Sequence, residues 1–156
     1  SWNLGAWEVT MSHTKELIEE ALNKTGNVMP VNLAVSDIEG AQNLVGGGEG
    51  ATIASSGEGK QTEVTTVDSF VTKNMIPKID FIKMDVEGHE MNILRGAAAT
   101  IETFSPKMAI SVYHRGDDLA VIPQYILSLN SSYKFYLRHC TPIWGDTVHY
   151  ATTSPD

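Results

Sequence analysis

The chain has a single cysteine, Cys140, and this scarcity excludes an intrachain disulfide framework and a cysteine-based metal cluster. No apolar run approaches the roughly 20 residues that a membrane-spanning helix needs. Basic residues are also few, because 11 Lys and Arg stand against 19 Asp and Glu, and the formal net charge of −8 would repel nucleic acid. We therefore expect a soluble, cytoplasmic protein with no membrane span and no nucleic-acid partner.

The residues that are present suffice for one domain, which we expect to cover residues 1–156. Of the 156 residues, 42% are hydrophobic and 19% are charged, so the chain can bury a core without a second domain. Residues 40–59 differ, since they include seven glycines and few large side chains. Such a composition predicts a flexible Gly-rich loop or an irregular hairpin.

The stretch IDFIKMDVEGHE, residues 79–90, predicts a buried strand that ends in a carboxylate-rich turn. Apolar residues then recur every three or four positions through residues 89–104, which is typical of a helix packed on a sheet. In an open parallel sheet, ligands bind beyond the carboxyl ends of the strands. The pattern therefore places Asp85 and Glu87 at a binding edge.

The remaining elements alternate in the same way. Strands are predicted near residues 4–9, 28–35, 63–71 (running into a turn of helix), 79–85, 107–113, 133–139 and 147–151, and helices near 12–24, 89–104 and 117–129. The alternation predicts an α/β fold with a mostly parallel sheet. A C-terminal hairpin adds one antiparallel strand, which we expect at the edge of that sheet.

Several motifs together resemble the FkbM family of methyltransferases. The main motif is IDFIKMDVEGHE, which is followed by LRGA. The motifs AVSDIEG and VTTVDSF precede it, and YHR comes after the next strand. The likeness runs from about Ala6 to Ala151. It implies a Rossmann-like class I methyltransferase fold, S-adenosylmethionine as the methyl donor, and O-methylation of a sugar, a glycolipid or a polyketide-like metabolite.

The resemblance also implies a glycine-rich turn of the Asp-x-Gly-Ala-x-x-Gly type, which holds the methionine part of the cofactor. Asn3-Leu4-Gly5-Ala6 is a partial match, but Val9 replaces the last glycine, where a ligand approaches the backbone closely. The spacing from Glu8 to the strand near residues 28–35 leaves room for only one helix. We therefore align residues 6–8 with the second strand of the family, so that the domain is N-terminally truncated.

On this alignment a central strand is missing between the strand near residues 4–9 and the strand near residues 79–85. Two strand edges would then be exposed. We expect that the chain is a fragment of a longer protein, or that the gap is closed by re-pairing of strands or by a second chain in a homo-oligomer. The alternative function is a non-catalytic Rossmann-like binding or assembly module that has lost cofactor binding.

The cofactor-binding residues implied by the resemblance lie at strand ends. Glu8 would bind the cofactor ribose, and Ser36 and Asp37 would lie near the adenine; a solvated carboxylate and a turn Asp bonded to its own backbone are the alternatives. Asp85 would hold the cofactor's amino group or accept a proton from the acceptor hydroxyl. Its alternative role is to cap the following helix.

The catalytic candidates are Asp85, Glu87 and His114. His114 follows a strand that ends at the same predicted edge as Asp85, and imidazole titrates near neutral pH. Glu87 would also be stabilised by the helix dipole alone. The histidine spacing shows no metal-ligand pattern, so no metal is predicted.

Neighbouring polar residues are expected to have structural roles. Glu90 and Lys83 are placed in this group, with Lys83 buried in its strand and paired with a carboxylate. His89 is expected on the helix surface, and Arg115 is expected to bind an acidic substrate or to pair with one of two nearby aspartates. His139 and His149 are expected on the surface or in the hairpin, and Tyr113 is a candidate for lining a substrate pocket.

Overall fold

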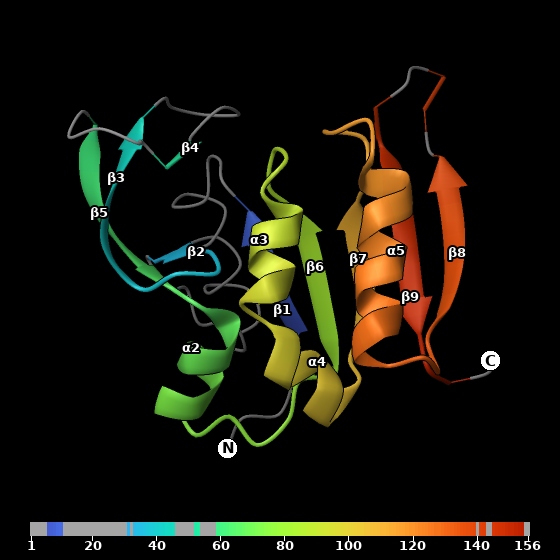
Figure 1. The fold of residues 1–156 in the computed structure, drawn as a ribbon, viewed down its shortest axis with the longest axis horizontal. Helices are drawn as coiled ribbons and strands as arrows, with labels where there is room; N and C mark the ends of the chain where they lie inside the picture. Colours follow the sequence, from blue (N-terminus) through green and yellow to red (C-terminus); the bar gives the residue numbers. More distant parts are fainter. Residues whose placement is uncertain are drawn as a thin grey trace, which may run out of the picture.

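The computed structural model describes residues 6–10, 31, 33–45, 52–53, 59–139, 141–142 and 145–154. Within them the strands form two sheets, one with five strands and one with four (Figure 1). The five-stranded sheet has the order β1 (Ala6–Thr10), β6 (Phe81–Asp85), β7 (Lys107–Ser111), β9 (Thr147–Thr152) and β8 (Lys134–His139). None of the helices in these residues is long and apolar enough to cross a membrane.

The parallel part of the five-stranded sheet consists of β1, β6 and β7. β9 runs antiparallel to both β7 and β8, so it lies inside the sheet while β8 forms the edge. The expectation that the antiparallel strand lies at the edge was therefore wrong. α5 (Asp118–Leu129) carries the chain from β7 past one strand position to β8, and β9 then fills that position.

β1 pairs directly with β6, and Thr10 lies opposite Asp85. The structure thus places β1 directly against β6, and the missing central strand stays a prediction. The backbone of Glu8 lies opposite Lys83 in this register. The helix expected near residues 12–24 lies outside the described residues.

The second sheet has the order β2 (Ala34–Val35), β5 (Lys60–Thr65), β3 (Gly40–Val45) and β4 (Thr52–Ile53). β2 pairs parallel with β5, and β3 pairs antiparallel with β5 and β4. Residues 40–45, within the stretch expected to be a flexible loop or an irregular hairpin, form β3, which pairs antiparallel with β4. Six of the seven glycines of that stretch lie after this strand.

The helix predicted over residues 89–104 is two helices, α3 (Glu90–Arg95) and α4 (Ala98–Phe104). The break has a physical cause in α2 (Val67–Lys73), whose Asp68 carboxylate accepts hydrogen bonds from the backbone N–H groups of Ala99 at 3.0 Å and Thr100 at 2.7 Å. These bonds satisfy N–H groups at the start of a new helix. The Asp68 backbone N–H in turn donates to the Gly96 carbonyl at 2.9 Å.

Gly96 lies at this break for a steric reason. A Cβ atom at this position would lie 2.1 Å from the carbonyl oxygen of Ser36, which follows β2. A backbone atom cannot move aside cheaply, so only glycine allows the two segments to approach this closely. The contact fixes the residues after β2 against α3.

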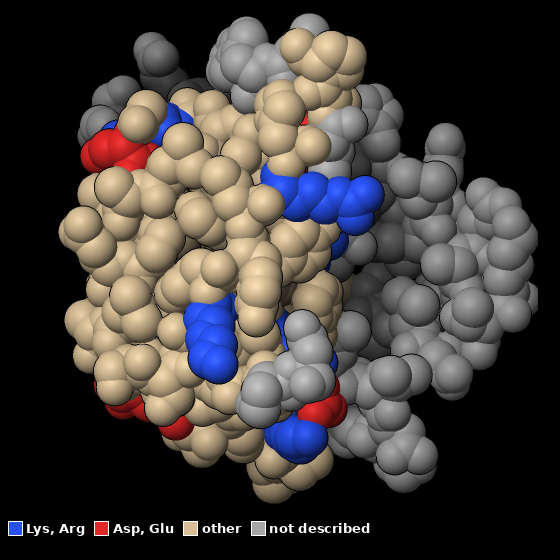
Figure 2. All heavy atoms as spheres, turned by 90° about the vertical axis from the view of Figure 1, so that its right-hand side faces the viewer, with Lys and Arg blue, Asp and Glu red and all other residues tan. Residues whose placement is uncertain are grey.

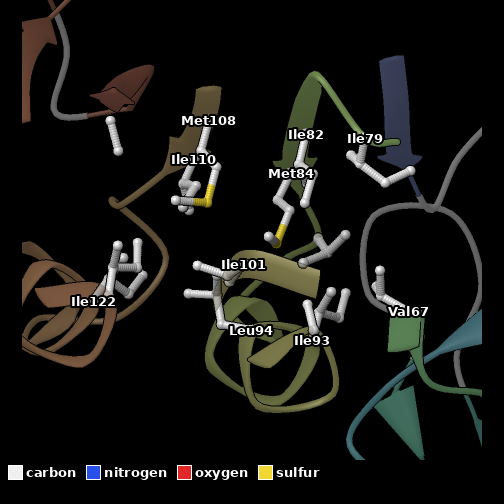
Figure 3. Close-up of a cluster of buried hydrophobic side chains, with 14 of the residues drawn as sticks. Val67, Ile79, Ile82, Met84, Ile93, Leu94, Ile101, Met108, Ile110 and Ile122 are labelled. Carbon is white, nitrogen blue, oxygen red and sulfur yellow. The ribbon is translucent and has the colours of Figure 1, made fainter. Parts of the chain in front are cut away.

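The hydrophobic core lies between the five-stranded sheet and helices α3, α4 and α5 (Figure 3). Ile82 and Met84 from β6 and Ile110 from β7 face Leu94 and Ile101 from the helices, and all five are at most 1% exposed. Burial of side chains of this size contributes about 1.5–3 kcal/mol each. The core thereby holds the carboxyl ends of β6 and β7 at one edge.

His149, expected on the surface or in the hairpin, lies in β9 of the β8–β9 hairpin and is buried. Its Nε2 lies 3.3 Å from the carbonyl oxygen of Leu119 in α5. That carbonyl lacks a helical partner because Pro123, four residues later, has no backbone N–H. Burial lowers the pKa of His149.

The face that includes the β8 edge is mostly uncharged, with Lys and Arg side chains scattered over it (Figure 2). β8 itself has Lys134 and Arg138, and charged side chains on an edge strand oppose further strand pairing. Tyr136 and Leu137 of the same strand are 48% and 57% exposed. Charged side chains therefore flank the exposed apolar residues of β8 and oppose pairing with a further strand.

Candidate active site

The turn after β6 aims acidic side chains back over the sheet edge. Glu87 has a φ of 53° and Gly88 has a φ of 91°, so two consecutive residues are in the left-handed region. This conformation costs a non-glycine residue roughly 1–2 kcal/mol. Arg115 braces the turn, since its Nη1 donates a hydrogen bond to the Gly88 carbonyl at 3.4 Å. Strain held in this way is common where a side chain must be placed for function.

His114, which follows β7, brings three acidic side chains together. Its Nε2 lies 3.4 Å from Glu87 Oε2 and 3.6 Å from Asp85 Oδ1, and its Nδ1 lies 2.8 Å from Glu90 Oε1. The His114 side chain is 7% exposed, whereas those of Asp85 and Glu87 are 38% and 34% exposed. The three residues predicted as catalytic thus lie in one cluster, with the two carboxylates facing outward.

Glu90 orients His114. It is fully buried, and its Oε1 both accepts a hydrogen bond from the Val86 backbone N–H at 3.1 Å and contacts His114 Nδ1. Glu90 therefore holds Nδ1 in place, and Nε2 is the ring nitrogen that faces Asp85 and Glu87.

Tyr113 is a hydrogen-bond partner of Asp85. Its hydroxyl donates a hydrogen bond to Asp85 Oδ1 at 3.2 Å, and its ring lies against the His114 ring with centroids 4.0 Å apart. Burial, together with the negative charge of Asp85, raises the pKa of Tyr113 to about 12. The hydroxyl therefore stays protonated and acts as a donor at neutral pH.

Asp85 does not cap the helix that follows it. The residue at the cap position of α3 is His89, which makes no side-chain capping bond. The carboxylate that reaches back from α3 to the turn is that of Glu90, which binds the Val86 N–H. The alternative role considered for Asp85 is therefore absent from this turn.

A second cluster joins the N-terminal part of α3 to the residues after β2. Ser36 Oγ lies 2.9 Å from His89 Nε2 and donates to Asp37 Oδ1 at 3.0 Å. Asn92 Nδ2 lies 3.2 Å from both Asp37 carboxylate oxygens. His89, expected on the helix surface, is thus half-buried and joins α3 to the two predicted adenine-side residues.

The charges of this second cluster are set by burial and hydrogen bonding. Burial lowers the pKa of His89, despite the opposing effect of the Asp37 charge. For Asp37, burial alone would raise the pKa, but hydrogen bonds from Asn92 and Ser36 outweigh it, and the pKa is lowered. At neutral pH the pair is therefore an ionised carboxylate beside a neutral imidazole.

Other predicted residues are placed as follows. The Glu8 side chain lies outside what the structure describes, so its contact with a ribose stays a prediction. Lys83 is half-buried rather than buried. The Asp118 carboxylate accepts from the Arg115 backbone N–H at 3.0 Å, so the aspartate contacts the main chain of Arg115.

A model of the "Methyltransferase FkbM domain" matches residues 5–135 of the chain. The chain belongs to the FkbM methyltransferase family. The hexuronic acid methyltransferase AglP of Haloferax volcanii is 29% identical over 123 residues, which cover 74% of this chain and 49% of AglP. The crystal structure of methyltransferase FkbM from Methylobacillus flagellatus superposes with a TM-score of 0.65 at 27% identity, over 88% of this chain and 32% of that one. This FkbM domain therefore spans about half the length of AglP and about a third of the crystallised chain.

Sequence reasoning missed two contacts in this FkbM domain. Glu90 was assigned a structural role without its contact to His114, which is 24 residues away. His89 was placed on the surface without its contact to Ser36, which is 53 residues away. A weak signal existed, because both residues lie in the EGHE motif, but their partners depend on strand order and could not be read from spacing.

Proposed function

We propose that this domain is an S-adenosylmethionine-dependent O-methyltransferase that acts on a hydroxyl of a sugar, a glycolipid or a polyketide-like metabolite. The observation that carries the proposal is the cluster of Asp85, Glu87 and His114 at the carboxyl end of β6, in a chain of the FkbM family. The name of AglP, a hexuronic acid methyltransferase, favours a sugar among these acceptors.

The residues at this edge fit the cofactor's charge. S-adenosylmethionine carries a sulfonium and an ammonium group, and it supplies an electrophilic methyl carbon when it is bound. Asp85 and Glu87 are partly exposed carboxylates that would attract such a cation. Ser36 and Asp37 contact the N-terminal part of α3 through His89 and Asn92, and Asp37 would accept a hydrogen bond from an adenine amino group. Glu8 would bind the ribose.

Proton removal is assigned to the same cluster. Methyl transfer forms a bond from the acceptor oxygen to the methyl carbon and breaks the carbon–sulfur bond, so the hydroxyl proton must leave. His114 Nε2 and the Asp85 carboxylate are the candidate proton acceptors, and Glu90 keeps the His114 ring in position. Such a base contributes about 10²–10⁴-fold, and alignment of donor and acceptor contributes the rest.

Calorimetric titration with S-adenosylhomocysteine tests the proposal first. We expect binding by the chain, weakened at least tenfold in Asp85→Asn and unchanged in Glu102→Gln, an exposed carboxylate on α4. The alternative, a non-catalytic module, predicts no binding at millimolar ligand. Transfer of a tritiated methyl group to a glycan that ends in a hexuronic acid then tests the acceptor class.

A further inference from the structure

Asp85, Glu87 and His114 present three metal-ligand atoms to one another. One carboxylate oxygen from each acid and one ring nitrogen of His114 all lie within 4.8 Å of one another. We propose that these three side chains bind a divalent first-row transition-metal ion. One imidazole nitrogen and two carboxylate oxygens suit Mn²⁺, Fe²⁺ or Zn²⁺, whereas Mg²⁺ and Ca²⁺ prefer oxygen ligands alone.

The separations between the ligand atoms favour a metal over direct hydrogen bonds. His114 Nε2 lies 3.4 Å from Glu87 Oε2 and 3.6 Å from Asp85 Oδ1. A charge-assisted N–H···O bond would be about 2.7–2.9 Å long. Two ligands held about 2.0–2.1 Å from one tetrahedral ion are instead about 3.3–3.4 Å apart. Both separations from Nε2 are closer to that spacing than to the length of a charge-assisted hydrogen bond.

The state of His114 is the second and independent observation. Its side chain is 7% exposed, and its Nε2 has no hydrogen-bond partner among the described residues. Because Glu90 engages Nδ1 at 2.8 Å, Nε2 is the ring nitrogen that faces the oxygens of Asp85 and Glu87. A cation between these three atoms would give the buried Nε2 a partner.

Glu90 completes the pattern of a metal-binding histidine. A histidine that ligates a metal almost always donates its other ring N–H to a carboxylate, a carbonyl or water. Here the fully buried Glu90 has that role, and the Val86 N–H anchors the same carboxylate oxygen. The sequence predicted no metal, because the ligands come from the turn after β6 and the residues after β7 and show no regular spacing.

The catalytic use of such an ion rests on the proposed function. A cation beside the acceptor hydroxyl lowers the pKa of that hydroxyl and stabilises its negative charge. With an ion bound, His114 Nε2 and the Asp85 carboxylate would be ligands rather than the proton acceptors assigned above, and the hydroxyl proton would leave to water. Binding of the ion itself does not depend on methyl transfer, so it can be tested alone.

Mn²⁺ binding measured by electron paramagnetic resonance tests the site. Free Mn²⁺ gives a six-line signal that falls on binding, and we expect one ion per chain. Glu87→Gln and His114→Gln should each weaken binding at least tenfold. The matched controls Glu102→Gln and His139→Gln change the same chemical groups at exposed positions and should leave binding unchanged. Zn²⁺ should displace the bound Mn²⁺.

Circular dichroism identifies variants that fail to fold. The ligand atoms can also be tested in the unaltered chain, which needs no substitution. Bound Mn²⁺ should show electron spin echo modulation from an imidazole nitrogen. The proposal is overturned if neither ion binds the folded chain up to 1 mM, or if binding lacks that modulation and survives both site substitutions. The S-adenosylhomocysteine titration separates failure of this proposal from failure of the proposed function. A chain that binds S-adenosylhomocysteine but no metal ion rejects the metal site. A chain that binds the metal ion but no S-adenosylhomocysteine rejects the proposed function.

Discussion

His89 is the N-cap residue of α3 and His114 contacts Glu90 in the first turn of the same helix, and the environments of the two rings differ. His89 is half-buried and contacts a neutral hydroxyl, that of Ser36 after β2. His114 is almost fully buried and contacts the buried carboxylate of Glu90. The first ring joins α3 to the four-stranded sheet, whereas the second presents a nitrogen to two more carboxylates at the end of β6.

The two histidines show that the partner of each ring determines which segments or side chains that ring brings together. Burial lowers the pKa of His89, and its contact with the Ser36 hydroxyl connects two segments. The buried Glu90 carboxylate fixes the orientation of His114, so that the other ring nitrogen faces the two outer carboxylates. We call the His114 contacts of the turn between β6 and α3 the proposed binding side and the His89 contacts the anchoring side, and each side can be disrupted separately.

Glu90→Ala should have the largest effect, because it removes the partner of the His114 side. The substitution leaves His114 Nδ1 and the Val86 N–H buried without an acceptor. We expect a loss of about 3 kcal/mol in the free energy of unfolding, measured by urea denaturation. Glu102→Ala on exposed α4 is the control, and a loss no greater than that of the control would mean that Glu90 does not hold the cluster.

Gly96→Ala should disrupt the His89 side alone. The new Cβ would lie 2.1 Å from the Ser36 carbonyl oxygen, so the segment after β2 must move away from α3. We expect about 2 kcal/mol of destabilisation and a shift of the His89 ring signals in NMR spectra, with His114 unchanged. Gly116→Ala, where a Cβ would meet nothing within 4 Å, is the matched control. Equal shifts in both rings would show that the two sides are not separable.

Asp68→Ala should have a smaller effect on the free energy of unfolding, because it acts at the break between α3 and α4. Its carboxylate caps α4 from α2 through the N–H groups of Ala99 and Thr100. Loss of a cap costs about 1 kcal/mol, which thermal denaturation can measure. Asp68→Asn should keep part of the effect, because its amide oxygen can still accept one bond. No change in either variant would rule out this explanation of the break between α3 and α4.

The pH dependence of stability should be the smallest effect and should come from the anchoring side. Burial lowers the pKa of His89, so the unfolded chain binds more protons as the pH falls below about 6.5, and stability decreases. The midpoint temperature of thermal unfolding should therefore decrease as the pH is lowered from 7 to 5. His149 acts in the same direction, so His89→Gln should reduce the slope without abolishing it. An unchanged slope would show that His89 does not contribute.

The parts of the fold with local signals were predictable from the sequence. The strand through Asp85 and the acidic turn after it were recognisable because apolar pattern and charge change abruptly there, and β6 ends at Asp85 as expected. The family motifs led to the correct family. The convergence of His114 with Asp85 and Glu87 followed from the rule that neighbouring parallel strands end at one edge.

The parts that depend on tertiary contacts were not predictable. The helix over residues 89–104 has a continuous apolar stripe, and its break results from Asp68 and Ser36, which are distant in sequence. β9 lies inside the sheet because of where α5 returns the chain, which local pattern does not encode. The division of strands into two sheets has the same origin.

The central claim is that the carboxyl end of β6 is the methyl-transfer site. Amide NMR spectra of the ¹⁵N-labelled chain, titrated with S-adenosylhomocysteine, test it most directly. We predict that the largest shifts occur at residues 36–37, 85–90 and 114, with residues 134–139 of β8 unchanged. Absence of shifts at millimolar ligand, or shifts centred on β8, would contradict the claim.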